Sequence, residues 1–178
     1  MKIKIQIPRK VRNMLIFTIL IFLAALIGQR FSFGYLHAAD PFAMLAAYFL
    51  PLPLALPAAL IPCLAVDLIK TPEWAVMIAT VISKTLMILL VRLLRNKPAV
   101  QKAPDLYLAP VALIHIPVSY LACSVLLLTE GSGWNSFFLA TTTMRKDMIQ
   151  GFGGLLLFSL LFSGYKAYRK RKAEKETK

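Results

Sequence analysis

Long apolar runs separated by short polar stretches make up most of this chain. A helix needs about 20 apolar residues to cross the hydrocarbon core of a bilayer. The runs of that length, or somewhat shorter, cover residues 11–29, 36–50, 54–69, 73–94, 106–129 and 144–165, and each ends near a charge, a proline or a glycine. Only the sequence PLPL separates the second run from the third, so these two are expected to form a tight pair. The pattern predicts an all-α membrane domain of six helices that occupies residues 1–178.

The composition and the placement of the charges support this class. Hydrophobic residues make up 58% of the chain, and the mean hydropathy is +0.68. The net charge is +13, but the basic residues do not alternate with aromatic residues, as they would on a surface that binds nucleic acid. The basic residues instead form three clusters: residues 2–12, residues 92–102, and the tail at residues 166–178. With six helices all three clusters lie on one side, so the positive-inside rule places both termini in the cytoplasm.

The sequence contains no motif that predicts catalysis, a metal or a cofactor. Cys63 and Cys123 lie inside apolar runs, where a thiol packs as a small hydrophobe. His37 and His115 have no spacing that would place metal ligands on one face. A phosphate-binding loop, a nucleophile elbow and a metalloprotease motif are all absent from the sequence. We therefore expect a protein that is not an enzyme.

One lysine inside the fourth run is the strongest functional signal. Lys84 lies near the middle of residues 77–94, where an ammonium group costs about 3 kcal/mol or more. Counting 1.5 Å per helical residue places Asp40, Asp67 and Gln150 in the outer half of the membrane as well. Two roles are open to Lys84, which either contacts a solute or pairs with Asp40 or Asp67.

Aromatic and amide groups lie on the same side as these polar residues. An interfacial belt alone would explain Trp74 and Trp134. Together with the buried polar residues, however, they indicate an outward-facing pocket for a flat solute. The predicted solute contacts are Lys84, Asp40, Gln150, Tyr35, Trp134, Asn135, Tyr120 and His115. A second group is predicted to form a structural ion pair or helix contacts: Asp67, Thr80, Gly151 and Gly154.

Several short motifs resemble a family of membrane proteins. Asp40 opens the second run, Ala65-x-Asp67 ends the third, Thr80-x-x-x-Lys84 lies in the fourth, and MIQGFGG lies in the sixth. This pattern is similar to the substrate-binding S components of energy-coupling factor (ECF) transporters, in the branch of riboflavin, hydroxymethylpyrimidine and pyridoxine carriers. The family's Ala-x-x-x-Ala docking pair is not found in the cytoplasmic half of the first run, which offers only Ala24-x-x-x-Gly28 near its outer end.

The resemblance implies a multi-pass subunit of a prokaryotic plasma membrane that binds a vitamin or a vitamin precursor from outside. Its implied partners are a coupling subunit and two ATPases, besides membrane lipid, and no nucleic acid. Three alternatives come from the residues themselves. They are a membrane scaffold whose basic clusters bind lipid or a partner, an ion-coupled carrier, and a small enzyme that uses Asp67, His115 or Lys84 for proton transfer.

Overall fold

The described part of the chain is entirely helical. The computed structural model describes residues 8–30, 38–70, 74–131, 133 and 135–176. Its elements are α1 (Arg9–Arg30), α2 (Ala39–Phe49), α3 (Leu52–Lys70), α4 (Trp74–Leu94), α5 (Pro98–Lys102), α6 (Pro104–Tyr107), the 3-10 helix η1 (Ala109–Ile114), α7 (His115–Thr129) and α8 (Asn135–Glu176). The predicted all-α class is therefore confirmed.

Five segments of these helices are long and apolar enough to cross a membrane. They are Arg9–Ile27, Leu52–Ile69, Met77–Leu94, Pro104–Thr129 and Met148–Glu176. This is the composition of a multi-pass membrane protein. The second predicted span is different, because α2 has 11 residues. At 1.5 Å per residue it is about 16 Å long, roughly half the thickness of a hydrocarbon core.

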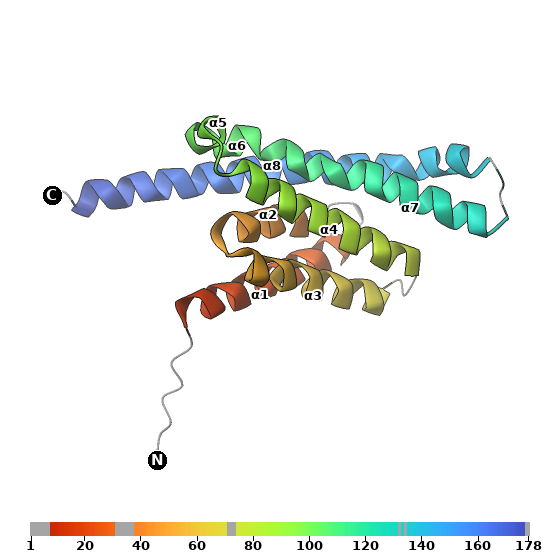
Figure 1. Cartoon of the computed structure of the whole chain (residues 1–178), viewed down its shortest axis with the longest axis horizontal. Helices are drawn as coiled ribbons and strands as arrows, with labels where there is room; N and C mark the ends of the chain where they lie inside the picture. The colour runs from red at the N-terminus through yellow and green to blue at the C-terminus, as the bar shows by residue number, and fades with distance from the viewer. Residues whose placement is uncertain (1–7, 31–37, 71–73, 132, 134, 177–178) are drawn as a thin grey trace, which may run out of the picture.

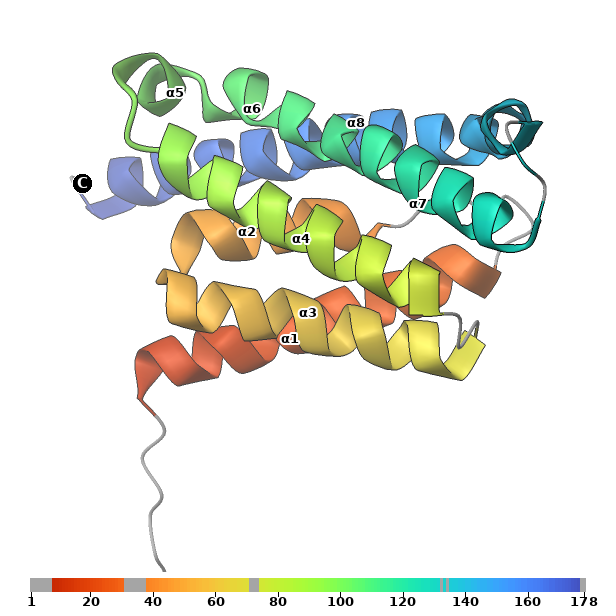
Figure 2. The same cartoon turned by 45° about the vertical axis from the view of Figure 1, so that its right-hand side comes forward.

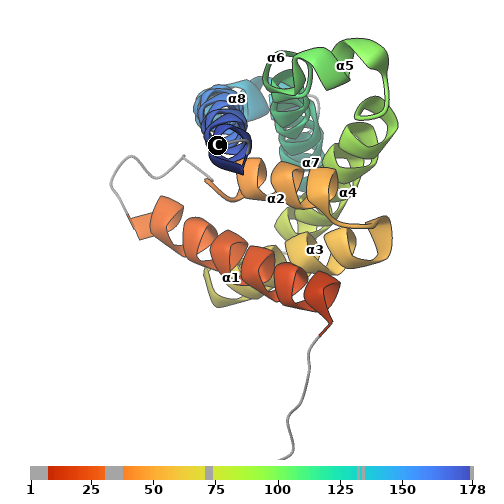
Figure 3. The same ribbon diagram turned by 90° about the vertical axis from the view of Figure 1, so that its left-hand side faces the viewer.

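Short α2 is the central helix of the bundle. It packs against α1, α3, α4, α8 and η1. Figure 3, viewed along the bundle, shows α1 and α3 on one side of it and α7 and α8 on the other. Ala39, Ala43, Ala46 and Ala47 have no exposed surface. Small side chains on most of its faces let the neighbouring helices approach closely, as they do in membrane bundles.

The two ends of the bundle differ in charge. The start of α1, the turn between α2 and α3, the α4–α5 connection and the end of α8 lie at one end (Figures 1 and 2). This end, called the basic end below, carries the exposed Arg9, Lys10, Lys97 and Lys102 and the basic residues that follow Tyr165. The opposite end, called the far end, holds the end of α3, the start of α4 and the end of α7.

Two arginines satisfy the last carbonyl groups of α2 at the basic end. Arg95 Nη1 donates to the carbonyl oxygen of Tyr48 at 2.8 Å, and Arg92 Nη1 donates to that of Leu50 at 3.0 Å. The last carbonyls of a helix have no partner within it and carry partial negative charge. The guanidinium groups therefore stabilise the carboxyl-terminal end of α2.

The fifth and sixth predicted helices have different boundaries in the structure. The predicted span 106–129 is divided into the end of α6, η1 and α7. Pro104 and Pro110 lie at the starts of α6 and η1, where a proline favours a new helix. The predicted span 144–165 lies inside α8, which has 42 residues. Residues 135–143 of the expected outer loop and most of the expected basic tail belong to this helix. It is about 63 Å long and extends beyond the bundle (Figure 1).

Candidate functional site

Three polar side chains from distant parts of the chain meet in the bundle interior. Lys84 Nζ donates to Asp40 Oδ1 and forms a salt bridge with it, while Gln150 Nε2 donates to Asp40 Oδ2 at 3.2 Å. Asp40 is fully buried, Lys84 is 2% exposed and Gln150 is 6% exposed. The sequence analysis predicted these three as solute contacts, and the structure brings them together as one hydrogen-bonded network.

The depth of this network follows from the helices that carry it. Lys84 is ten residues from the start of α4 at Trp74, which corresponds to about 15 Å along the helix axis. Asp40 is the second residue of α2, so α2 begins at the level that the Lys84 side chain reaches. The amino terminus of α2 is therefore near the middle of the membrane-spanning region. Asp40, in the first helical turn, also complements the positive end of the helix dipole.

A second carboxylate lies on α3, on the far-end side of this network. Asp67 and Cys63 are four residues apart on the buried face of α3, and both are within electrostatic range of Lys84. Asp67 is 5% exposed, and its Oδ2 atom has no hydrogen-bond partner among the described residues. The sequence left Asp40 and Asp67 open as partners of Lys84, and in the structure Lys84 forms its salt bridge with Asp40.

The glycines of α8 bring this helix close to the network. A Cβ atom built on Gly154 would lie 3.4 Å from Ala112 Cβ and 3.8 Å from Asp40 Cβ. One built on Gly151 would lie 2.9 Å from Ile116 Cδ1. Both positions therefore act as close helix contacts, in the role that the sequence predicted for them.

The remaining predicted residues are spread over other elements. His115, the first residue of α7, has its Nε2 2.9 Å from Ser119 Oγ. Tyr120 is half-buried on α7 and its carbonyl oxygen accepts from Ser124 Oγ at 2.8 Å, while the carbonyl oxygen of Thr80 accepts from Ser83 Oγ. Asn135 is exposed at the start of α8. Tyr35 and Trp134 lie outside the described residues.

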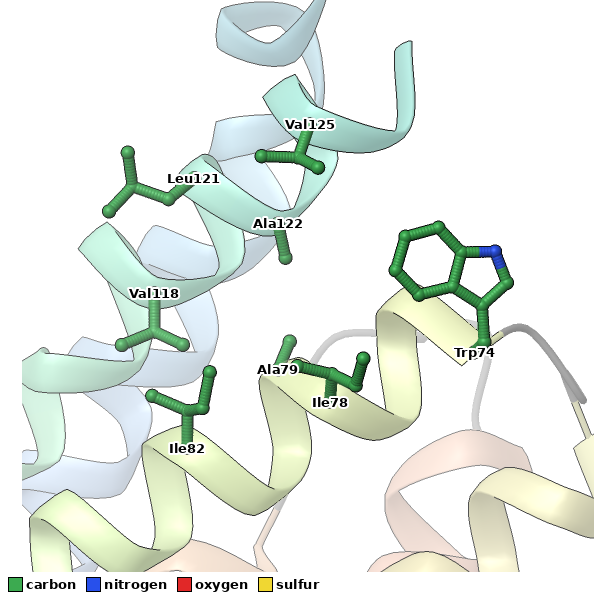
Figure 4. Close-up of a pocket in the computed structure, with 8 residues that line it drawn as sticks. All are labelled: Trp74, Ile78, Ala79, Ile82, Val118, Leu121, Ala122 and Val125. Carbon is green, nitrogen blue, oxygen red and sulfur yellow. The ribbon is translucent and has the colours of Figure 1, made fainter. Parts of the chain in front are cut away.

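Neither of two surface cavities found on the described residues involves the network. One, of about 230 Å³, is a groove between α4 and α7. Figure 4 shows its side chains: Trp74, Ile78, Ala79, Ile82, Val118, Leu121, Ala122 and Val125. This apolar lining suits lipid chains and offers no polar group beyond the indole of Trp74 to a water-soluble solute.

The other cavity, of about 330 Å³, lies between α8 and the segment α6–η1. It is lined by Asp105, Leu106, Ala109, Pro110, Leu155 and Ser159. Asp105 is held there by Lys166 Nζ at 3.0 Å and by Ser163 Oγ at 3.1 Å. These contacts hold α6, in the segment that connects α4 to α7, against α8 at the basic end.

The sequence analysis did not predict the roles of Arg92, Arg95 and Asp105. It assigned both arginines to topology alone. A signal was present, since Arg92 and Arg95 are three residues apart at the end of an apolar run and so share one helix face. Within the described residues, no group of three His, Cys, Asp or Glu side chains is arranged to hold a metal ion.

Comparisons of the chain with protein-family models, with curated proteins and with solved structures found no match. The functional argument therefore depends on the site itself. Its defining features are a short central helix that begins at mid-depth, a buried lysine that is paired there, and a nearby carboxylate with a free oxygen.

Proposed function

We propose that this protein is the substrate-capturing membrane subunit of an ECF-type importer and binds a water-soluble vitamin or vitamin precursor. The observation that supports the proposal most strongly is the convergence of Asp40, Lys84 and Gln150 at the amino terminus of α2. Ionisable groups inside a membrane bundle are costly and mark binding sites or transport paths. Membrane transporters commonly build their solute sites at mid-membrane, where short or broken helices begin.

The solute is proposed to bind on the far-end side of the network. An ammonium group has three donors, and one of them bonds to Asp40. The others and the first backbone N–H groups of α2 are suited to acceptor groups of a solute. In this proposal the Lys84–Asp40 pair holds α2 against α4 in the absence of solute, and the same lysine contacts solute when it enters.

Uptake requires separate energising subunits in this proposal. The sequence has no phosphate-binding loop, so a coupling subunit and two ATPases would supply the work of release into the cell. The Ala-x-x-x-Ala pair of the family is absent from the basic half of α1. Docking to the coupling subunit would therefore use other contacts at the basic end.

The topology is a further expected result. We place the basic end in the cytoplasm, with both termini there and α2 as a sixth, partly spanning helix. Arg9, Lys10, Lys97, Lys102 and the end of α8 would otherwise all lie on the external side, which the positive-inside rule disfavours. Single cysteines at positions 97–102 should react with an impermeant maleimide only after the cells are opened. Labelling in intact cells would contradict this topology.

Binding of a vitamin by the purified protein is the central test. We expect at least one of riboflavin, pyridoxine, pyridoxamine and 4-amino-5-hydroxymethyl-2-methylpyrimidine to bind with a Kd below about 1 μM, which corresponds to about −8 kcal/mol. Calorimetry on the protein in nanodiscs measures this directly. The same protein, alone in liposomes, should not accumulate the solute against a gradient. Accumulation by the isolated chain would favour an ion-coupled carrier instead.

A membrane scaffold is the second candidate. It is favoured by the burial and internal pairing of Lys84 and Asp40, since such a pair also arises where polar groups only hold helices together. Absence of binding across the vitamin panel would select the scaffold over the importer subunit, provided that the purified protein is folded.

A further inference from the structure

Asp67 is a buried ionisable residue that makes no hydrogen bond to the network of Asp40, Lys84 and Gln150. Among the residues that the structure describes, none donates a hydrogen bond to its Oδ2 atom, although only 5% of the surface of Asp67 is exposed. A carboxylate that is removed from water without a partner is costly. Lys84, the cation within electrostatic range, is already bonded to Asp40. Asp67 Oδ2 is therefore a buried hydrogen-bond acceptor without a donor among the described residues.

The position of Asp67 suits contact with an entering solute. It is three residues before the end of α3 at Lys70, which corresponds to about 4.5 Å along the helix axis. Lys84 is about 15 Å from the adjoining start of α4. The orphaned carboxylate oxygen thus lies on the far-end side of Lys84, between that lysine and the helix ends through which a solute would arrive.

A cationic nitrogen is the partner that satisfies this oxygen most fully. An ionised carboxylate only accepts hydrogen bonds. A neutral hydroxyl or amide would supply a donor and leave the negative charge uncompensated. A protonated amine supplies the donor and the charge together, and such charge-assisted bonds are about twice as strong as neutral ones.

We propose that Asp67 is the specificity-determining residue of the solute site and accepts a hydrogen bond from a positively charged nitrogen of the captured molecule. This inference rests on the solute-binding function proposed above and narrows it to solutes with a protonated amine. In this proposal, acceptor groups of the same solute accept hydrogen bonds from Lys84 and from the first backbone N–H groups of α2. Asp67 and Lys84 therefore select opposite ends of one polar molecule.

Two solutes that differ at a single group test this assignment. Pyridoxamine and pyridoxine share one ring, and a CH₂–NH₃⁺ group in the first replaces a CH₂–OH group in the second. We expect the full chain in nanodiscs to bind pyridoxamine at least tenfold more tightly than pyridoxine. Asp67→Asn keeps the size of the side chain and removes its charge, so it should reduce pyridoxamine affinity at least tenfold more than pyridoxine affinity.

Asp105→Asn is the matched control, because Asp105 is a carboxylate on α6 that pairs with Lys166, whereas Asp67 lies near the end of α3. It should leave the preference for pyridoxamine as it is in the parent. The stability of the solute-free protein supplies a second readout. Removal of a buried negative charge whose Oδ2 atom has no donor among the described residues should raise the Tm of Asp67→Asn by about 2–4 °C, the shift that 1 kcal/mol gives in a chain of this size.

The outcomes separate this inference from the function on which it rests. Binding of pyridoxine or riboflavin with no preference for the amine, or a preference that survives Asp67→Asn, overturns the inference and leaves the importer subunit in place. A lower Tm for Asp67→Asn overturns it as well, since the carboxylate would then have a structural partner. If no solute of the panel binds to the folded protein, the proposed function fails and this inference fails with it.

Discussion

Lys84→Met should destabilise the protein by about 3–5 kcal/mol and abolish solute binding. Methionine keeps most of the length of the side chain and removes all three donors. The substitution leaves the fully buried Asp40 carboxylate without its lysine, and breaking a buried pair from one side carries a cost of this size. Thermal unfolding in detergent and calorimetric titration with the bound vitamin measure the two effects.

Addition of Asp40→Asn to Lys84→Met separates stability from function. Asparagine keeps an oxygen that Gln150 Nε2 can still reach, and the double variant buries no charge at this position. Most of the lost stability should return, because replacing both members of a buried pair is often neutral. Solute binding should stay lost. If the double variant binds solute as the parent does, Lys84 has only a structural role and the site proposed here is wrong.

Gly154→Leu should place a large side chain where α8 packs closely against η1 and α2. The Cβ atom alone would lie 3.4 Å from Ala112 and 3.8 Å from Asp40, so the rest of a leucine side chain has to displace η1 or α2. Overpacking of this kind costs about 1–3 kcal/mol or more. We expect a lower Tm and weaker solute binding, since Asp40 and Gln150 would be moved apart.

Gly164→Leu on the same helix is the matched control. An added Cβ atom at this glycine meets no atom within 4 Å. Leucine is also the better helix former, by up to about 1 kcal/mol. The Tm should therefore stay constant or rise slightly. Equal losses from Gly154→Leu and Gly164→Leu would show that the close packing of α8 against α2 is not what holds the site together.

The polar residues of the candidate site could be selected from the sequence because each of them interrupts an apolar run. Lys84 is the clearest example, since few residues other than a functional or paired one are retained at such a depth. Gly151 and Gly154 were likewise predicted as helix contacts, and a Cβ atom built at these positions would lie 2.9 Å from Ile116 Cδ1 and 3.4 Å from Ala112 Cβ. The choice between pairing and solute contact for Lys84 was left open, because spacing along the chain does not say which carboxylate a lysine meets.

Helix boundaries were predicted less well where polar residues that favour a helix extend it beyond the apolar run. Residues 135–143 were predicted to belong to an outer loop, yet they contain no proline or glycine to end a helix, and α8 includes them. The basic tail continues the same helix for a similar reason, since lysine, arginine, glutamate and alanine are all good helix formers. Hydropathy thus locates the part of a helix inside the membrane and does not locate its ends.

The sequence by itself determined the class of this protein: long apolar runs with few charges require helices that satisfy their own backbone hydrogen bonds in lipid. It also determined which polar residues are exceptional, because an ionisable group in such a run needs a partner. Only the tertiary structure decided that α2 is a short central helix starting at mid-depth and that Asp40 pairs with Lys84. It also decided that Asp67 Oδ2 has no hydrogen-bond partner among the described residues. These features depend on contacts between residues 44 or 110 positions apart, and no local pattern of the chain encodes which helices pack together.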